Sequence, residues 1–402
     1  MDSIGMASDQ VDDEYSRMVD PNHDIGSSSE MNNINDHNVN EEMMKKRENA
    51  RTIQKQLLEQ IKEEHARQVK KTNCFRFGNI YSLPKLNLTL HRELTKHQGK
   101  VFNIAWSRDS SKLISISKDQ HLIVWDVKKS TIETNINFMY SPFKMGCDIS
   151  PSSKLVACGG LDNLWLVYDI SSKIDKTPQD HVPKIILEGS LGWSSSCKFL
   201  SDQNLVTASS DSLARLWDIP TGKVICTFIG HSVEVMCVSI PKNENCIMGQ
   251  VLATGSCDPN AKLWDLKSGT CIQTFPHLMD VDDVQFFPND QFIVTASSDG
   301  VCRLFDLRFP SRELLQYQNP DENAVCGIRS LSLSASGRVL FCACEDHSVY
   351  AWDVLKGTLL EGMEKFAKRK RKDMISAVRV SPNGEYLACS SWNKSIYLLK
   401  HE

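Results

Sequence analysis

The stretch Ser256-Cys257-Asp258-Pro259-Asn260-Ala261-Lys262-Leu263-Trp264-Asp265 decides the fold of this 402-residue chain. It contains a small residue, an Asp two positions later, an aromatic residue six positions after that Asp, and a second Asp. The same spacing recurs at Asp119 with Trp125-Asp126, Asp162 with Tyr168-Asp169, Asp211 with Trp217-Asp218, Asp299 with Phe305-Asp306, and Asp346 with Trp352-Asp353. In a seventh, degenerate copy Asn393 and Leu399-Lys400 take these places, and successive copies lie 43, 49, 47, 41, 47 and 47 residues apart.

A period of about 40 to 50 residues, with four short apolar runs in each period, is typical of WD40 repeats. One repeat forms a four-stranded sheet that cannot bury both of its faces alone, so the sheets must pack against one another. We therefore predict an all-β fold, a seven-bladed WD40 β-propeller over residues 86–402. Leu86 to Leu94 alternates apolar and polar residues outside any repeat, and we expect this strand to complete the last blade and close the ring.

The resemblance to WD40 repeats implies a buried polar network in each well-formed repeat. In that family the turn Asp accepts hydrogen bonds from a His before the first strand, and a Ser or Thr on the second strand joins that His to the Trp indole, which satisfies the buried polar groups. Two full sets are predicted: His97, Ser117, Asp119 and Trp125, and then His231, Ser256, Asp258 and Trp264. His277, Ser297 and Asp299 form a third set, with Phe305 in place of Trp. Ser, His and Asp together could be taken for a catalytic triad. A nucleophile would not recur in every repeat, however, so we predict no catalytic residues.

The segment before the propeller divides by composition. Residues 1–40 hold nine Asp or Glu against one Arg and lack any apolar period, which predicts a disordered acidic tail. Residues 41–73 are rich in strong helix formers and predict a coiled-coil helix, followed by a linker over residues 74–85. The apolar seam of the helix consists of Ala50, Ile53, Leu57 and Ile61. Such a narrow seam must pack on the propeller or pair with a second helix.

Bulk properties exclude several kinds of site. The 14 Cys show neither a CxxC pair nor a zinc-ligand spacing, which predicts reduced thiols and no metal. No apolar run is long enough for a signal peptide or a membrane span, so we expect a partner to supply any membrane attachment. A net charge of −4 gives no reason to expect nucleic acid. The basic run Lys368 to Lys372 could be a nuclear address, an anionic-lipid contact or a solvated loop.

From about residue 41 to its end the chain resembles the β subunits of heterotrimeric G proteins. The stretches that carry the resemblance are Leu155-Val156-Ala157-Cys158-Gly159-Gly160-Leu161-Asp162-Asn163, Ala261-Lys262-Leu263-Trp264-Asp265, Cys302-Arg303-Leu304-Phe305-Asp306-Leu307-Arg308 and Ser334-Ala335-Ser336-Gly337-Arg338. The Phe in place of Trp at Phe305 is itself a trait of that family. Trp106 to Ser110 and Trp352 to Gly357 are similar to fungal mating-pheromone β subunits.

The resemblance implies a protein that performs no chemistry and needs no cofactor. Its N-terminal helix would form a parallel coiled coil with a small prenylated γ subunit, through the seam at Ala50, Ile53, Leu57 and Ile61. One rim of the propeller would bind the GDP-bound α subunit, and a seven-transmembrane receptor would act indirectly through α. The released βγ pair would bind kinase or scaffold effectors. The γ lipid would hold the complex at the cytoplasmic face of the plasma membrane, with a part remaining cytoplasmic.

The resemblance also implies which residues meet α and effectors. They are Lys100, Phe102, Phe143, Met145, Leu161, Trp193, Glu234, Asp280, Ser298 and Trp392. Two alternatives stay open: an unrelated WD40 scaffold, for example in splicing, ubiquitin ligation or RNA processing, and an enzyme that uses the propeller channel. The helix before the ring and the Phe305 trait disfavour a generic scaffold. No loop shows paired acids, a GxSxG motif or a phosphate-binding Gly loop, which disfavours an enzyme.

Overall fold

The computed structural model describes Leu83 and residues 86–138, 143–171, 182–242, 250–309, 313–318, 326–360 and 374–401. The predicted acidic tail, the coiled-coil helix with its seam residues Ala50, Ile53, Leu57 and Ile61, and the basic run lie outside these ranges, and so does the linker apart from Leu83. Within the part of the chain that the structure describes, no helix has the length and apolarity needed to cross a membrane.

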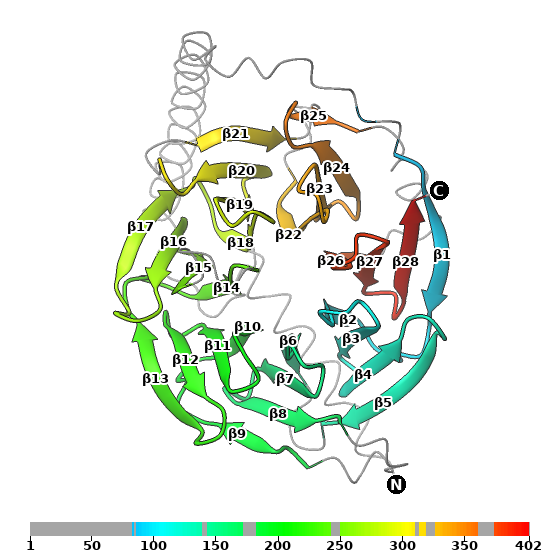
Figure 1. Cartoon of the computed structure of the whole chain (residues 1–402), viewed down its shortest axis with the longest axis vertical. Coiled ribbons are helices and arrows are strands. Elements are labelled where there is room, and N and C mark those ends of the chain that lie inside the picture. The colour runs from blue at the N-terminus through cyan, green and yellow to red at the C-terminus, as the bar shows by residue number, and fades with distance from the viewer. Residues whose placement is uncertain are drawn as a thin grey trace, which may run out of the picture. The chain divides into compact units, whose positions relative to one another are not determined.

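Seven antiparallel sheets of four strands surround a common axis in the described part of the chain, which confirms the predicted all-β, seven-bladed propeller (Figure 1). From the inner to the outer strand, blade 1 is β2 (Val101–Trp106), β3 (Lys112–Ser117), β4 (His121–Asp126) and β5 (Thr131–Asn137); blade 2 is β6 (Lys144–Ile149), β7 (Leu155–Gly160), β8 (Trp165–Asp169) and β9 (Ile185–Leu187); and blade 3 is β10 (Ser194–Phe199), β11 (Asn204–Ser209), β12 (Ala214–Asp218) and β13 (Lys223–Phe228). Blade 4 is β14 (Val235–Ser239), β15 (Val251–Ser256), β16 (Asn260–Asp265) and β17 (Cys271–Pro276); blade 5 is β18 (Val281–Phe286), β19 (Phe292–Ser297), β20 (Val301–Asp306) and β21 (Glu313–Gln318); blade 6 is β22 (Ile328–Leu333), β23 (Val339–Cys344), β24 (Val349–Asp353) and β25 (Thr358–Leu359); and blade 7 is β26 (Ile375–Val380), β27 (Tyr386–Ser391), β28 (Ile396–His401) and β1 (Leu88–Leu94).

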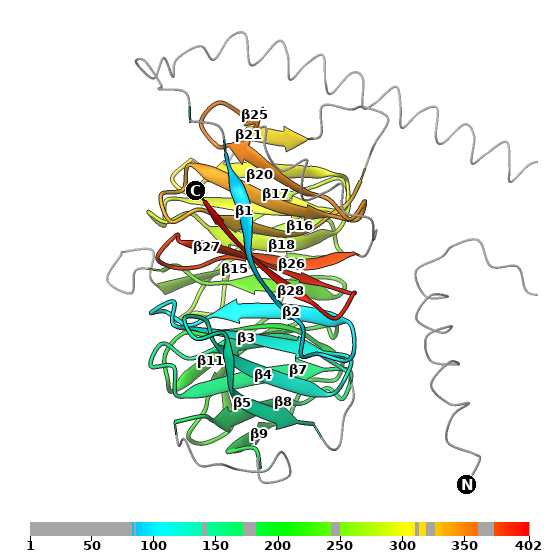
Figure 2. The same ribbon diagram turned by 90° about the vertical axis from the view of Figure 1, so that its right-hand side faces the viewer.

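The first strand of the chain closes the ring. β1 pairs antiparallel with β28, with Leu90 opposite Leu399, so the predicted closing strand is confirmed. Figure 2 shows β1 lying along β28 on the outside of blade 7. Leu94 and Leu398 pack in the same buried cluster as Val101 of β2, and this cluster joins the last blade to the first. Pairing the two ends of the chain removes the free sheet edges that an open arc would leave.

The core follows the repeat. All seven aromatic-marker positions are buried: Trp125, Tyr168, Trp217, Trp264, Phe305, Trp352 and Leu399. Each packs in an apolar cluster of the kind that fills the space between neighbouring sheets, as Phe305 does with Leu263 of blade 4 and Val284 of blade 5. Burying a large aromatic side chain removes about 150 to 250 Å² from water, so these positions stabilise the contact between blades. Leu399 is smaller than Trp, but it is buried in the same way.

Candidate functional site

A buried polar network joins the inner loop of blade 1 to its third strand. His97 Nδ1 lies 2.9 Å from a carboxylate oxygen of Asp119 and donates to it. His97 Nε2 then accepts the hydroxyl proton of Ser115 at 2.7 Å, and the Ser115 oxygen accepts the Trp125 indole N–H at 2.9 Å. Burial by itself would raise the pKa of Asp119, but the His97 hydrogen bond and backbone donors outweigh burial and lower the pKa to about 2.

The hydroxyl that links His to Trp in this network is Ser115, so the prediction of Ser117 is wrong. Ser115 lies opposite Ile123, two residues from Trp125 across the ladder. Ser117 lies beyond the last position of β3 that pairs with β4 and is too far along the strand to reach the indole, because each residue advances a strand by about 3.3 Å. The Ser117 hydroxyl instead accepts the backbone N–H of Asp119 at 3.3 Å and closes the turn.

Blade 4 repeats this arrangement and requires the same correction. His231 Nδ1 donates to Asp258 at 2.7 Å. The link is Thr254, whose hydroxyl lies 2.7 Å from His231 Nε2 and 2.8 Å from Trp264 Nε1, rather than the predicted Ser256. Ser256 accepts the backbone N–H of Asp258 at 3.1 Å. In both blades the Ser and Thr hydroxyls are fully engaged within the sheet, as a structural network requires.

Blade 5 departs further from the pattern. His277 Nε2 pairs with Thr295 at 2.7 Å rather than with Ser297, and its Nδ1 donates to a backbone carbonyl at 2.9 Å. Asp299 does not receive the His277 proton, because Arg303 lies 2.6 Å from its carboxylate. Burial and the nearby Arg303 charge lower the pKa of His277 to about 4, so this imidazole is neutral at pH 7. The third predicted set is therefore wrong in two of its partners.

Each blade also presents three equivalent positions at one end of its inner two strands. We name position p the residue before the inner strand, position q the second residue of that strand, and position r the residue after the second strand. In every blade the N–H at position r donates to the carbonyl at position p over 2.8 to 3.0 Å: Lys118 to Lys100, Leu161 to Phe143, Ser210 to Trp193, Cys257 to Glu234, Ser298 to Asp280, Glu345 to Gly327, and Trp392 to Met374. A shift in ladder register places position q in a β-bulge each time. The repetition sets all three positions on one face of the ring, which we call the rim.

All ten residues implied for α and effector binding occupy these positions. Lys100, Phe143, Trp193, Glu234 and Asp280 stand at position p, Phe102 and Met145 at position q, and Leu161, Ser298 and Trp392 at position r. The structure thus brings together residues that span almost 300 positions of the sequence. Leu161 is 44% exposed, whereas the other nine side chains are half-buried. The rim is therefore a surface of partly covered, pre-positioned side chains.

Two lysines of blade 1 lie over aromatic rings of the neighbouring blades. Lys100 Nζ is 4.3 Å from the centroid of the Trp392 ring, and Lys118 Nζ is 5.8 Å from that of Phe143. A cation within about 6 Å of a ring face is attracted by the ring quadrupole. Trp392 is half-buried and lies outside the buried core, as expected for a residue just before the degenerate turn at Asn393.

Charge is distributed unevenly around the rim. Positions p and r of blade 1 are basic, whereas blades 4 to 6 carry the acidic residues Glu234, Asp280, Asp282 and Glu345. The Asp282 carboxylate accepts the Ser298 hydroxyl at 2.5 Å and lies 3.6 Å from Arg329. Burial raises the pKa of Asp282 to about 6 against these interactions. A bound partner would therefore meet a basic and aromatic half and an acidic half.

Comparison with known proteins agrees with this geometry. The model of the family described as "G protein beta WD-40 repeat protein" matches residues 41–400. The chain belongs to this family. It is 31% identical over 320 residues to a "Guanine nucleotide-binding protein subunit beta" of Oryza sativa subsp. indica, covering 77% of this chain and 83% of the relative. It is 32% identical over 317 residues to one from Nicotiana tabacum, and 34% identical over 316 residues to a "subunit beta-5b" of Danio rerio, covering 78% of this chain and 77% of that relative.

Two adjacent glycines allow the rim of this family member to form in blade 2. A Cβ on Gly160 would lie 1.7 Å from the carbonyl oxygen of Phe143, so only glycine permits the p–r hydrogen bond there. A Cβ on Gly159 would lie 2.6 Å from the ring of Trp165, which packs flat against the strand. In this blade buried Lys144 pairs with the turn carboxylate of Asp162. These glycines therefore have a steric role, for which the sequence alone gave no reason.

Sequence reasoning missed several rim residues of this family member. Lys118, Met236, Cys257, Asp282, Arg329 and Glu345 occupy positions q and r in blades 1, 4, 5 and 6. The loops that lead to position p add exposed apolar side chains, among them Leu191 at 87%, Met279 at 49% and Val233 at 39% exposure. Counting back one residue from the marker Asp would have found Lys118, Cys257 and Glu345, because position r always directly precedes that residue.

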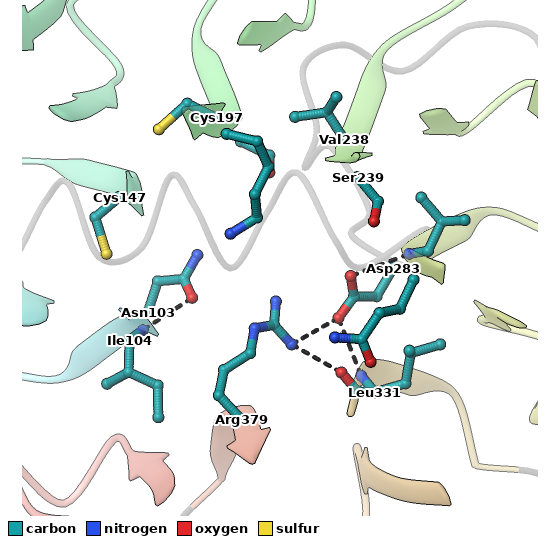
Figure 3. A pocket seen from close by; sticks show the side chains of 13 residues that line it. Asn103, Ile104, Cys147, Cys197, Val238, Ser239, Asp283, Leu331 and Arg379 are labelled. Carbon is teal, nitrogen blue, oxygen red and sulfur yellow. Dashed lines mark hydrogen bonds and ion pairs between the residues drawn. The ribbon is translucent and has the colours of Figure 1, made fainter. Parts of the chain in front are cut away.

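In the channel of the propeller, ion pairs join the inner strands of different blades, and the space left between them is smaller than a typical enzyme pocket. Figure 3 shows side chains of the inner strands pointing toward one another across it. Lys198 of β10 lies 2.8 Å from Asp148 of β6, and Arg379 of β26 lies 2.9 Å from Asp283 of β18. The cavity that Lys198, Asp283 and Arg379 help to line measures about 80 Å³, against about 300 to 1,000 Å³ for typical small-molecule sites. The family is of a non-enzymatic scaffold type. Within the described ranges no three His, Cys, Asp or Glu side chains gather as metal ligands.

Proposed function

We propose that the chain serves as the β subunit of a heterotrimeric G protein whose rim binds the GDP-bound α subunit and, after α leaves, effectors. One observation carries the proposal. The ten residues that the family resemblance implies for these contacts fall, without exception, on the three equivalent positions that share one face. An unrelated WD40 scaffold has no reason to place aromatic, Met and charged residues at these positions together.

The composition of the rim suits a reversible protein interface. Aromatic residues, Met and charged anchors near the centre of an interface supply most of its binding energy. Phe143, Met145 and Trp193 provide apolar area on blades 2 and 3. Lys100 on one side and Asp280 on the other provide opposite charges that select and orient a partner. An α subunit and effectors that use the same face would compete for it.

Residues 41–73 would bind the γ subunit through their apolar seam, and the γ lipid would hold the complex at the cytoplasmic face of the plasma membrane. A seam of this kind is too narrow to be stable in water alone, and of its two possible partners, the propeller and a second helix, the family resemblance favours a γ helix. The likeness of Trp106–Ser110 and Trp352–Gly357 to mating-pheromone β subunits supports a place in pheromone response, with kinase or scaffold effectors and indirect coupling to a seven-transmembrane receptor.

The seam can be tested by co-purification. Leu57→Asp with Ile61→Asp would put two charges where the proposal requires a dry interface, and an unpaired buried charge costs several kcal/mol. We expect a co-expressed γ subunit to be lost from the double mutant and the chain to leave the membrane fraction. The matched control, Lys55→Asp with Lys62→Asp, places the same charges on the opposite side of the expected helix and should retain γ. Retention of γ by both pairs would overturn the proposed seam.

The α contact needs its own assay. Purified full-length chain with γ should capture α loaded with GDP, release it when α is loaded with a non-hydrolysable GTP analogue, and compete with effectors for the rim. Affinity purification followed by mass spectrometry identifies the partners present in the cell. Recovery of spliceosomal or ubiquitin-ligase components without an α subunit would favour the scaffold alternative instead.

A further inference from the structure

Four cysteines gather where blade 6 meets blade 5. Cys302, Cys342 and Cys344 are buried in one apolar cluster, and Cys326 packs against it from the loop before β22. The sulfur atoms of Cys302 and Cys342 lie 3.2 Å apart across the two blades. Of these four, Cys326 alone is partly exposed to solvent. It is therefore the one that a small oxidant can reach.

The surroundings of Cys326 favour its thiolate. Its sulfur accepts the backbone N–H of Asp346 at 2.8 Å and lies 3.7 Å from the carbonyl oxygen of Gly327. The interactions with the Cys344 thiol and the Asp346 N–H lower the pKa of Cys326, although its burial and the carboxylates of Asp346 and Glu345 oppose them. Arg329 lies 2.6 Å from the Glu345 carboxylate and neutralises it in part. A lowered pKa on a partly exposed sulfur raises the fraction of thiolate, which is the nucleophilic form of cysteine.

Cys344 has the opposite properties. It is 4% exposed, and its hydrogen bond to Cys326, together with burial, raises its pKa, so that it stays a protonated thiol. It ends β23 opposite Ile328, whereas Cys326 precedes β22 and takes no part in the ladder. Cys326 can therefore approach Cys344 without breaking a strand pair. A reactive, accessible cysteine beside a protected one is the arrangement of a redox-sensing pair.

We propose that Cys326 is a site of oxidation by hydrogen peroxide and that Cys344 resolves the oxidised sulfur as a disulfide. In the first step the Cys326 thiolate attacks the peroxide O–O bond, a sulfenic acid forms, and the departing oxygen leaves as water after gaining a proton. In the second step the Cys344 sulfur attacks the Cys326 sulfur, an S–S bond forms, and the sulfenic hydroxyl leaves as a second water with the Cys344 proton. Two thiols are oxidised by two electrons and one peroxide is reduced. This inference is independent of the proposed function.

The test uses the reduced, full-length chain, treated with a small excess of hydrogen peroxide, alkylated and digested for mass spectrometry. We expect a Cys326–Cys344 cross-linked peptide from the wild type. Cys344→Ser should instead accumulate a Cys326 sulfenic acid that dimedone captures, and Cys326→Ser should give neither product. Serine retains an acceptor for the Asp346 N–H, and melting temperatures establish that both variants are folded.

Cys271 provides the matched control, because it is exposed on outer strand β17, in a different blade from the four cysteines described above, and its sulfur lies against the Gln273 carbonyl and the Thr274 hydroxyl. Cys271→Ser should leave the cross-link unchanged. In the wild type Cys326 should be oxidised at least tenfold faster than Cys271 despite its lower exposure. Equal rates at the two cysteines, or oxidation of Cys326 in the wild type without linkage to Cys344, would overturn the proposal.

Discussion

The contact between Lys100 and Trp392 makes a quantitative prediction about α binding. Truncating either residue to Ala should weaken binding of GDP-loaded α about tenfold, or about 1.4 kcal/mol, because each is an anchor of the proposed rim. The Lys100 ammonium lies 4.3 Å from the centre of the Trp392 ring, so each single variant also removes the cation–π contact. That contact holds both side chains in their binding positions before α arrives, and we assign about 0.5 to 1 kcal/mol of each single loss to this preorganisation.

The double variant should therefore lose less than the product of the singles. Counting the shared contact once gives a loss of about 20- to 50-fold rather than about 100-fold. Biolayer interferometry with GDP-loaded α measures all four affinities. Lys112→Ala is the control: Lys112 stands at the opposite end of β3 and pairs with Glu133 at 3.0 Å, so its loss should leave affinity unchanged. Wild-type affinity in both singles would refute the rim as the α site, and a full hundredfold loss in the double variant would refute the coupling. A large fall in melting temperature for Trp392→Ala would instead assign Trp392 to the core.

Three further predictions concern stability, measured by chemical denaturation. Thr254→Val leaves a buried imidazole nitrogen and an indole N–H without partners and should cost about 2 to 4 kcal/mol, whereas Ser256→Ala should cost about 1 kcal/mol; equal costs would contradict the observed network. Asp282 has a native pKa of about 6, above its unfolded value, so its contribution to stability, measured as the difference between wild type and Asp282→Asn, should fall as pH rises from about 4 to about 6, while His277, with its lowered pKa, adds stability over the same range in both proteins. A difference that stays constant with pH would show that Asp282 is not responsible. Gly160→Ala should destabilise blade 2 far more than Gly357→Ala, because a Cβ on Gly160 would overlap the Phe143 carbonyl oxygen, whereas a Cβ on Gly357 meets nothing within 4 Å and costs only the strain of its left-handed φ of +66°, about 1 to 2 kcal/mol; comparable losses would mean that the p–r hydrogen bond is dispensable.

The sequence by itself determined the architecture. The spacing from Asp258 to Trp264 and its recurrences give the number of blades and the buried aromatic position of each one. The alternation from Leu86 to Leu94 gives the closing strand. These features are readable because they are local: a strand of period two and a turn at fixed distance need no knowledge of distant residues.

Which side chains form hydrogen bonds with one another inside each blade, by contrast, depended on the tertiary structure. The repeat pattern alone could not distinguish Ser115 from Ser117, since both alternate onto the same strand face and only ladder register decides which reaches the indole. Nor could it show that Arg303 rather than His277 would hold Asp299. Which of two donors reaches a carboxylate depends on differences of a few ångströms in their positions, and the spacing of residues in the sequence does not give those positions.

The rim likewise depended partly on the sequence and partly on the tertiary structure. The residue types at single positions came from the family resemblance, but their convergence depends on seven equivalent hydrogen bonds that only the closed ring brings to one face. Lys100 and Trp392 meet because β1 joins the two ends of the chain. Cys326 and Cys344 likewise become a pair only through the ladder of β22 and β23. Contacts between residues far apart in sequence depend on how the sheets pack around the axis, and no local pattern records that packing.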